Sequence, residues 1–585
     1  ISISGQPPAV AESATAPAHR SAATAVTMPN APQWRTEPSA AALARYAQPQ
    51  RRSEQFYFVL PDRFANGDPA NDTGGHTGDR MATGLDPTDP RFYHGGDLRG
   101  VQDRLDYIAG LGTTAIWLAP VFTNRPVQGS GSGASAGYHG YWTTDFTTVD
   151  PHFGTNADLR RLVELSHRRG IKVYLDVIVN HTADVLTNEQ GQSSYRSTAD
   201  APYRDAAGNR FNDANYADGG RDFPAVNAAS FPYTPAYPTA ADATAKTPAW
   251  LNDPTMYHNR GDSTFAGENS QYGDFYGLDD LWTERPEVVD GLTKIYSDWI
   301  TKAGVDGYRI DTVKHVNDAF WPQFTAGIDR AADAAGRDFF MFGEVYSADT
   351  AVDSRYVRTG GLGATLDFPF QSAATGYVAR SGSAADLAAV YADDASYAAR
   401  DTDAGALPTF LGNHDMGRIG SFIATGGGDP TSYLRRDQLG HELMFLTRGQ
   451  PVVYSGDEQG MVGSGGDAAA RQDMFASRVP GYAAETRIGT DHTGASDAYD
   501  PGHPLYRTIA SLAALRRDHQ GLRDGTQTTR YAAAGPGVFA FSRISTQQRV
   551  EYLVATNNAT TAQTVTVPTA AAGATFDQIY PAPAA

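Results

Sequence analysis

The stretch GVDGYRID (residues 304–311) carries an arginine and an aspartate two positions apart at the end of a short, mostly apolar run. Side chains two apart on a β-strand point to the same face. The next residues, TVKH (312–315), are also mostly polar. In barrels built from alternating strands and helices, the reactive groups lie at the carboxyl ends of the strands. The stretch therefore predicts a barrel strand with Arg309 and Asp311 directed into the barrel mouth.

From residue 55 onward, close to eight such strands alternate with amphipathic stretches. Helices are expected between the strands, for example at residues 156–169, 286–303 and 435–447. Alternating strands and helices are typical of a parallel α/β fold, and this number of units predicts an α/β protein with a (β/α)8 TIM barrel. The other expected strands are QFYFVL (55–60), TAIWLAP (114–120), KVYLDVIVN (172–180), FFMFGEV (339–345), residues 364–368, ALPTFLGN (406–413) and QPVVYSG (450–456).

One segment interrupts the alternation of strands and helices, and another follows it. Residues 182–284 are rich in Asn, Asp, Gly, Tyr and Pro and are too long for a βα loop, which predicts an inserted domain after strand 3 on the catalytic face. Residues 523–585 alternate as short strands, which predicts a C-terminal antiparallel β-sandwich that is truncated in this chain. The barrel then occupies residues 51–181 and 285–522, and the Ala/Pro/Ser/Thr-rich residues 1–50 form an N-terminal extension.

Charge and composition narrow the possible partners. A net charge of −19 repels nucleic acid and anionic membranes, so a neutral substrate is expected. The chain has no cysteine, so a bound metal would have oxygen or imidazole ligands, and calcium is the expected cofactor. No apolar run is long enough to span a membrane, and the chain begins at Ile1. We expect a processed, secreted, extracellular monomer.

Polar residues at four strand ends carry the predicted chemistry: DVIVNH (176–181), DGYRIDTVKH (306–315), FGEV (342–345) and FLGNHD (410–415). An arginine beside a carboxylate keeps it ionised, as a glycosidase nucleophile must be, so Asp311 is the candidate nucleophile. A second carboxyl about 5–5.5 Å away with a raised pKa can protonate the leaving oxygen. Glu344, on the next strand, is the candidate.

The remaining polar residues of these strand ends predict substrate contacts. Asp415 would bind ring hydroxyls and stabilise an oxocarbenium-like transition state. His181 and His414 would donate hydrogen bonds in the same subsite. Asp176 is interpreted as a support for the arginine. A buried arginine–aspartate pair is often only structural, but four polar strand ends together favour catalysis.

At these motifs the chain resembles glycoside hydrolase family 13, the α-amylase family, with four motifs in matching order between residues 55 and 518. The resemblance implies a barrel with an inserted domain, retention at the anomeric carbon and an α-glucan substrate. YHGYWTTDF (138–146) is similar to a segment of α-amylases and cyclodextrin glucanotransferases in which Tyr141 would stack on the sugar at the cleaved position. The resemblance also implies that the substrate is bound by Arg309, His139, Lys314, His315 and Tyr276.

The resemblance further implies two calcium sites. ANGDPAND (65–72) followed by HGGD (94–97) is similar to a calcium loop of cyclodextrin glucanotransferases. Carrying it over gives the ligands Asn66, Asp68, Asn71, Asp72, the carbonyl of Gly95, and Asp97. A second, more widespread calcium that pins the inserted domain to the barrel would use Asn180, Asp280 and the carbonyl of His315.

Three functions stay open at this point. The leading prediction is hydrolysis of α-1,4-glucosidic bonds in starch or maltooligosaccharides through a covalent glycosyl-enzyme. The nearest alternative is an α-glucan transglycosylase that uses the same residues and passes the glycosyl group to another sugar. The remote alternative is an inactive glucan-binding protein, which the presence of Asp311, Glu344 and Asp415 together disfavours.

Overall fold

The computed structural model describes residues 2–6, 53–399, 401–571 and 573–581, and only the backbone of the first of these ranges. Its largest sheet has eight parallel strands, each beside its neighbour in chain order, so the predicted TIM barrel is confirmed. The strands are β2 (Phe56–Val59), β3 (Ala115–Leu118), β8 (Lys172–Val177), β11 (Gly307–Ile310), β12 (Phe340–Gly343), β13 (Ala364–Thr365), β14 (Pro408–Phe410) and β15 (Gln450–Tyr454). Between β13 and β14, which are not paired in the sheet, the Asp367 N–H just after β13 donates to the Pro408 carbonyl of β14 at 2.9 Å.

The strands divide their side chains between two cores. Alternate residues such as Phe56, Trp117 and Tyr174 form an apolar cluster inside the barrel. Their neighbours, such as Tyr57 and Ile116, belong to the core between the barrel and its helices. Because the side-chain period of a strand is two, each strand's register decides which residues reach the barrel mouth.

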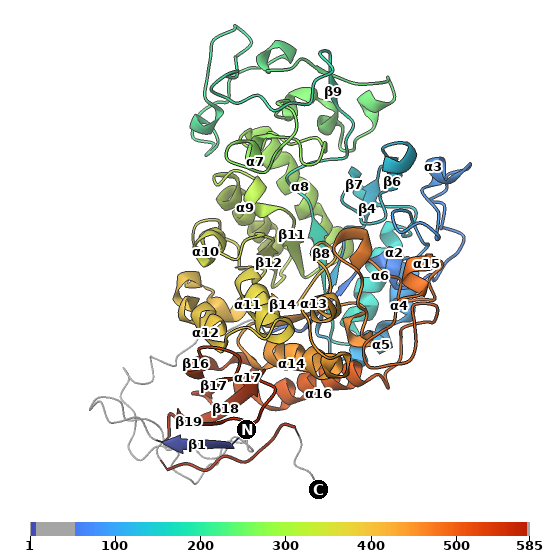
Figure 1. Cartoon of the computed structure of the whole chain (residues 1–585). Coiled ribbons are helices and arrows are strands. Elements are labelled where there is room, and N and C mark those ends of the chain that lie inside the picture. Colours follow the sequence, from blue (N-terminus) through green and yellow to red (C-terminus); the bar gives the residue numbers. More distant parts are fainter. Residues whose placement is uncertain (1, 7–52, 400, 572, 582–585) are drawn as a thin grey trace.

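Helices cover the outside of the barrel, as Figure 1 shows. The expected helix at residues 286–303 matches α8 (Pro286–Ala303), and the other two expected helices differ by one or two residues at their ends. Among the helices of the described ranges, none is long and apolar enough to cross a membrane. The others that surround the barrel are α4 (Leu98–Asp103), α5 (Leu105–Gly110), α6 (Asn156–His167), α9 (Phe320–Ala334), α10 (Thr350–Arg358), α11 (Phe368–Ala379), α12 (Ala384–Ala392), α13 (Ile419–Thr425), α14 (Tyr433–Leu446) and α16 (Pro504–Asp518).

The segment between β8 and α8 lies above the barrel in Figure 1, beyond the carboxyl end of β8. It contains little regular structure: the short strands β9 (Thr187–Asn188) and β10 (Pro235–Ala236), the helix α7 (Asn269–Tyr272) and several 3-10 turns. Its core is aromatic and gathers around the fully buried Trp282. The rings in contact with Trp282 are those of Tyr203, Phe211, Phe223, Phe231 and His258.

At the opposite end of the molecule, β16 (Thr526–Ala532), β17 (Val538–Ser545) and β18 (Val550–Asn557) form the predicted antiparallel sheet. β19 (Thr564–Pro568) packs its valines against one face of β17. It also pairs in parallel with β1 (Ser2–Gln6), a strand that the sequence analysis did not predict. The rest of the expected N-terminal extension, residues 7–50, lies outside the described residues.

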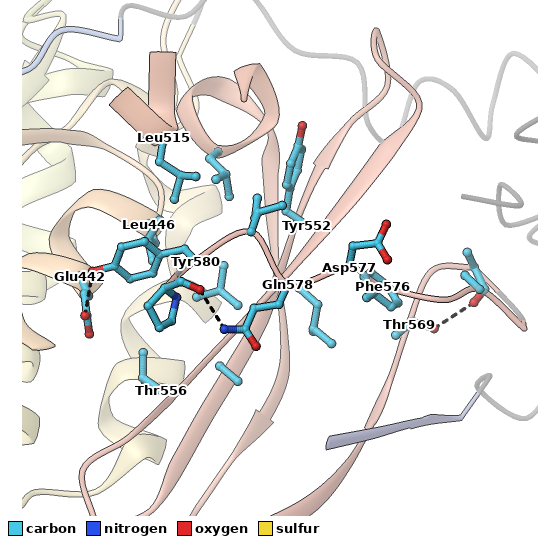
Figure 2. A pocket seen from close by; sticks show the side chains of 18 of the residues that line it. Glu442, Leu446, Leu515, Tyr552, Thr556, Thr569, Phe576, Asp577, Gln578 and Tyr580 are labelled. Atoms are coloured by element: carbon cyan, nitrogen blue, oxygen red, sulfur yellow. Dashed lines mark hydrogen bonds between the residues drawn. The ribbon is translucent and has the colours of Figure 1, made fainter. Parts of the chain in front are cut away.

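A cavity of about 640 Å³ separates this C-terminal sheet from α14 and α16 (Figure 2). Its lining includes Leu446, Leu515, Tyr552 and Phe576. The Tyr580 hydroxyl closes one side by donating to a carboxylate oxygen of Glu442 at 3.0 Å. The sheet is also tied to the carboxyl end of α14, where Arg543 donates to the Leu446 carbonyl at 2.9 Å. It therefore supports the end of the barrel that lies away from the polar strand ends.

Gly307 shows how tightly the barrel interior is filled. A Cβ at this position would lie 2.2 Å from both the Phe340 carbonyl oxygen and a ring carbon of Tyr174. The absence of a side chain at Gly307 therefore makes room for the Tyr174 ring, which is fully buried. Because protein interiors are close-packed, an added methyl group must displace that ring or the strand.

We expect Gly307→Ala to lower the free energy of unfolding by about 1–3 kcal/mol, the usual cost of overpacking a core. Thermal and urea unfolding would measure the change. The matched control is Gly376→Ala in α11, where a Cβ meets no atom within 4 Å. If the two alanine variants unfold together with the wild type, the packing argument is wrong.

Candidate active site

Arg309 is the centre of a buried charge cluster at the mouth of the barrel. Its Nη1 donates to Asp311 at 2.7 Å and to both oxygens of Asp176 at 2.8 and 3.0 Å. Its Nη2 lies 2.9 Å from a carboxylate oxygen of Glu344. One planar guanidinium thus holds three carboxylates from three neighbouring strands, because its donors have a fixed fork geometry. The structure brings Arg309, Asp311 and Glu344 together as the sequence predicted.

Strand register brings these side chains to one place. Arg309 is paired with Asp176 of β8 and with Phe342 of β12. Asp311 and Glu344 each lie two residues beyond an inward-facing position, so they continue the inward side of their strands past the apolar interior. Thr312 then turns the backbone with φ 48°, and its N–H donates to Glu344 Oε2 at 3.2 Å.

Burial sets the protonation of the two central carboxyl groups. Burial raises the pKa of Asp311 to about 6, although Arg309 opposes this. The same cause raises the pKa of Glu344 to about 7, with a further contribution from the charge of Asp311. The expectation that Arg309 keeps Asp311 fully ionised is therefore too simple, because desolvation outweighs the arginine. The predicted order of the two values holds: Glu344 keeps its proton to higher pH.

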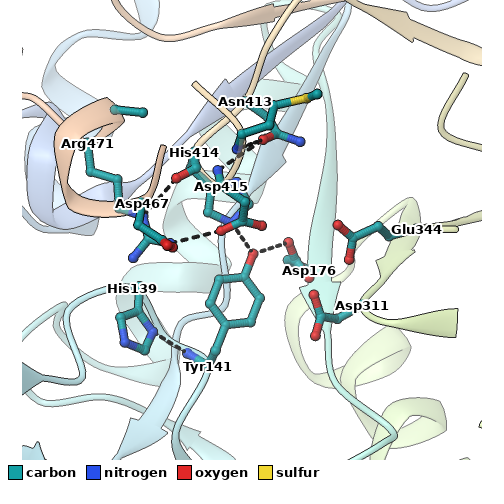
Figure 3. Close-up of polar contacts among 12 residues, drawn as sticks. His139, Tyr141, Asp176, Asp311, Glu344, Asn413, His414, Asp415, Asp467 and Arg471 are labelled. Atoms are coloured by element: carbon teal, nitrogen blue, oxygen red, sulfur yellow. Dashed lines mark hydrogen bonds and ion pairs between the residues drawn. The ribbon is translucent and has the colours of Figure 1, made fainter. Parts of the chain in front are cut away.

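Asp415 closes the other side of the cluster. Figure 3 shows Asp415 and Glu344 on either side of the Tyr141 hydroxyl, with Asp311 nearby. This hydroxyl donates to Asp176 at 3.0 Å and lies 2.9 Å from His414 Nε2. His414 stays neutral near pH 7, because burial lowers its pKa to about 3.

Arg471 is a site residue that the sequence analysis missed. Its Nη2 lies 2.8 Å from Asp415 and 2.9 Å from Asp467, and its Nε donates to the His414 carbonyl at 3.0 Å. His414, Arg471 and Arg309 together hold the pKa of Asp415 below its usual value against the effect of burial. Arg471 lies in a loop after β15 without a strand pattern, so no local signal in the sequence identified it.

Two of the predicted histidines contact different parts of the site: His139 contacts Tyr141, and His181 contacts the inserted segment. His139 Nδ1 accepts the backbone N–H of Tyr141 at 3.0 Å, which fixes the turn that presents the Tyr141 ring. His181 stacks face to face on Phe275, with 5.4 Å between the ring centres. Burial lowers the pKa of His181 to about 3, so this ring is also neutral.

Three other residues predicted to bind substrate line the rim beside the inserted segment. Lys314 Nζ donates to the Tyr346 carbonyl at 2.8 Å. His315 Nδ1 lies 2.8 Å from the Ser270 carbonyl in α7. Tyr276 is 80% exposed and packs on Phe265, whose ring contacts His315. The rim therefore presents exposed aromatic surface next to the charged cluster.

Residues of the first predicted calcium loop contact one another in pairs, among them Asp68, whose N–H donates to Asp97 Oδ2 at 2.8 Å. Asn66 donates to Asp72 at 2.8 Å, and a Cβ on Gly95 would lie within 2.9 Å of both side chains. The buried side-chain oxygen of Asn71 has no hydrogen-bond partner. Burial, with the charges of Asp97 and Asp68 among others, raises the pKa of Asp72 to about 6. Crowded oxygen donors that lack a counter-cation fit calcium.

The second predicted calcium set is brought together in part. Asn180 and Asp280 are buried, and the Asn180 side chain hydrogen-bonds to Asp280. The other partner of Asp280 is unexpected: His258 Nδ1 lies 2.6 Å from Asp280 Oδ2. Asp280 is thus shared between an imidazole and the Asn180 side chain.

Comparison with known proteins connects this geometry to a family. Residues 58–525 match the family model for the alpha amylase catalytic domain. The chain is 55% identical over 551 residues to an alpha-amylase of Streptomyces lividans, covering 93% of this chain and 59% of that protein. It is also 29% identical over 513 residues to a cyclomaltodextrin glucanotransferase of Klebsiella oxytoca, covering 82% of this chain and 66% of that protein.

A solved structure with the same architecture is that of the alpha-amylase from Geobacillus thermoleovorans, complexed with acarbose. The TM-score is 0.61 at 28% sequence identity, and the match covers 87% of this chain and 88% of that chain. This chain spans 59% of the length of its Streptomyces relative.

If Asp311 must be ionised and Glu344 protonated for reaction, the two pKa values predict a narrow bell-shaped pH profile of kcat/KM. Below about 6 Asp311 gains a proton, and above about 7 Glu344 loses its proton. Asp176 shares Arg309 and has its pKa raised to about 6 by burial, so the acidic limb belongs to this pair.

Steady-state rates on a maltooligosaccharide across this pH range test the prediction. A maltosyl fluoride is the control substrate, because its leaving group needs no proton. We expect the alkaline limb to disappear with the fluoride and the acidic limb to remain. An alkaline limb that persists with the fluoride would assign it to a group other than Glu344.

Proposed function

This chain belongs to the α-amylase family, and we propose that it hydrolyses α-1,4-glucosidic bonds in starch and maltooligosaccharides with retention of configuration. The observation that carries the proposal is the sharing of Arg309 by Asp311 and Glu344. This contact keeps two carboxyl groups with different pKa values close together, as a retaining glycosidase requires. We propose Asp311, Glu344 and Asp415 as the catalytic residues.

In the first step, a carboxylate oxygen of Asp311 attacks the anomeric carbon. The bond from that carbon to the glycosidic oxygen breaks, and Glu344 gives its proton to the departing oxygen. The pKa of about 7 at Glu344 supports this role, because the group is still largely protonated when Asp311 is ionised. Asp415, held ionised by Arg471, stabilises positive charge that develops on the sugar ring.

In the second step, Glu344 is a carboxylate and takes a proton from water. The water oxygen attacks the anomeric carbon, the ester bond to Asp311 breaks, and the sugar leaves with its original configuration. The Thr312 N–H and Arg309 both bind Glu344, so its carboxyl group stays in place through both steps. The Tyr141 ring, supported by His139, His414 and Asp176, is proposed to stack on the sugar at the cleaved position.

Transfer to a second sugar is the other candidate. The exposed Tyr276 and its neighbour Phe265 next to His315 favour it, because aromatic rings at the rim can hold an acceptor glucan. Lys314 and His315 are proposed to bind the leaving-group side. The likeness to a cyclomaltodextrin glucanotransferase also supports it, at lower identity than the likeness to an alpha-amylase.

Calcium is the proposed cofactor. The crowded donors Asn66, Asp68, Asn71, Asp72, Asp97 and the carbonyl of Gly95 would hold one ion, which would neutralise their charge and fix the loop. A second ion would bind Asn180, the carbonyl of His315 and Asp280, which also contacts His258. Both would be structural, because Asp311 and Glu344 need no metal for the steps above.

We also propose that residues 182–284 form the inserted domain and residues 523–585 the C-terminal domain of a secreted, extracellular monomer. The net charge of −19 supports a neutral glucan as partner rather than nucleic acid or an anionic membrane.

A time course with maltotetraose and calcium tests the proposed reaction. Hydrolysis predicts rising reducing ends and shorter products only, whereas transfer predicts longer, branched or cyclic products at nearly constant reducing ends. Glu344→Gln should lower kcat by about 10²–10⁴-fold, the usual contribution of a general acid. Binding of maltotetraose, measured by calorimetry, should remain. A fully active Gln variant would contradict the assignment, and no reaction by the wild type would favour the binding-only alternative.

Removal of calcium should lower the thermal midpoint of the chain. A ligand at 100 times its dissociation constant stabilises the folded state by about 2.7 kcal/mol. We expect Asp72→Asn to reduce the calcium-dependent part of the shift, because its carboxylate is crowded by Asp97 and Asp68. Asp79→Asn is the matched control, since Asp79 only caps a nearby helix. Equal calcium shifts in wild type and Asp72→Asn would remove this loop from the proposal.

A further inference from the structure

A third cluster of possible metal ligands is buried in the inserted segment, apart from the first calcium loop and the proposed catalytic carboxylates and next to Asp280 of the second calcium set. Asp213, His258 and Glu284 each offer a ligand atom, and the three atoms lie within 4.8 Å of one another. All three side chains are at most 1% exposed. All three residues belong to the inserted segment, and Glu284 lies at its end, two residues before the first residue of the barrel helix α8. A cation here would tie the interior of the segment to the point where it joins the barrel.

The cluster has unused ligand capacity. Glu284 Oε2 lies 2.9 Å from His258 Nε2, while the other oxygen, Oε1, is buried and has no hydrogen-bond partner. Burying a carboxylate oxygen without a partner is unfavourable, so such an atom indicates a missing ligand. Around Asp213, the indole N–H of Trp282 donates to Oδ2 at 2.8 Å, which fixes the orientation of that carboxylate.

The charges in this region are also unbalanced. Asp213, Asp280 and Glu284 bring three carboxylates to a single imidazole, with Arg260 as the other cation close to Asp213. A divalent ion would offset this excess of negative charge. Buried charges in proteins are normally paired or coordinate a metal.

We propose that Asp213, His258 and Glu284 bind a divalent transition metal ion of the zinc class. One imidazole nitrogen with two carboxylates suits zinc, whereas calcium prefers oxygen ligands alone. On binding, His258 releases the Nε2 proton to solvent and that nitrogen ligates the ion. Zinc–ligand distances are about 2.0–2.2 Å, so ligand atoms that now lie within 4.8 Å of one another must move closer on binding, and the unpaired Glu284 Oε1 is available to do so.

Asp280 would then act through the histidine. Its Oδ2 lies 2.6 Å from His258 Nδ1 and accepts that N–H, the arrangement by which carboxylates orient metal-bound histidines. This makes Asp280 a positioning residue for the zinc ion. The inference rests on these ligands and not on the proposed glucan hydrolysis.

The test is zinc binding by the untagged full chain in saturating calcium, so that calcium sites are already filled. Equilibrium dialysis against micromolar Zn²⁺ followed by elemental analysis gives the zinc content, and the thermal midpoint gives the effect on stability. The variants are His258→Gln and Glu284→Gln. The matched control is His441→Gln, which removes another buried histidine that contacts a carboxylate, Asp437.

We expect one zinc ion per chain in the wild type and in His441→Gln, and at least tenfold weaker binding in His258→Gln and Glu284→Gln. Zinc should raise the thermal midpoint of the first two proteins only. Should His258→Gln fail to fold, the visible spectrum of Co²⁺ bound to the wild type decides: a four-coordinate spectrum supports the site, and a six-coordinate spectrum contradicts it. Unchanged zinc binding in both variants, or none in the wild type, overturns the proposal.

Discussion

The active site depends on one buried guanidinium. Arg309 contacts Asp176, Asp311 and Glu344, which come from three adjacent strands. Three carboxylates could not remain charged in this desolvated place without a cation, and removing one partner from a buried ion pair typically costs about 3–5 kcal/mol. Burial raises the pKa of both Asp311 and Glu344 against the effect of Arg309, and Glu344 keeps the higher pKa. Part of this difference is intrinsic, since an unperturbed glutamate has a slightly higher pKa than an aspartate.

The inserted segment is held by charge in a comparable way. It has only short strands and an aromatic core around Trp282, so few strand-to-strand hydrogen bonds hold its backbone in place. Buried ion pairs hold it instead, such as His258 with Glu284 near its junction with α8 and Lys246 with Asp279. Negative charge exceeds positive charge in this segment, as it does in the first calcium loop (residues 65–97). Binding of the proposed metal ions at these two places would stabilise a chain that has no disulfides.

Much of the fold could be predicted because barrel strands carry strong local signals. Eight apolar runs were each found where a strand forms, since buried parallel strands are continuously hydrophobic. The predicted site residues Arg309, Asp311 and Glu344 follow the inward register of their strands. β1 was missed because its pairing with β19 joins residues from the two ends of the chain, and no local pattern reports such a partner.

The sequence by itself determined the barrel and the identity of the polar residues at its strand ends, because apolar periodicity and strand register are local properties. Only the tertiary structure decided which charged side chains contact one another. The Arg471 contact with Asp415 and the His258 contact with Asp280 and Glu284 link positions 56, 22 and 26 residues apart in loops. The raised pKa of Asp311 likewise comes from burial by the whole barrel. Desolvation and long-range ion pairs are properties of the packed molecule, so no stretch of sequence contains them.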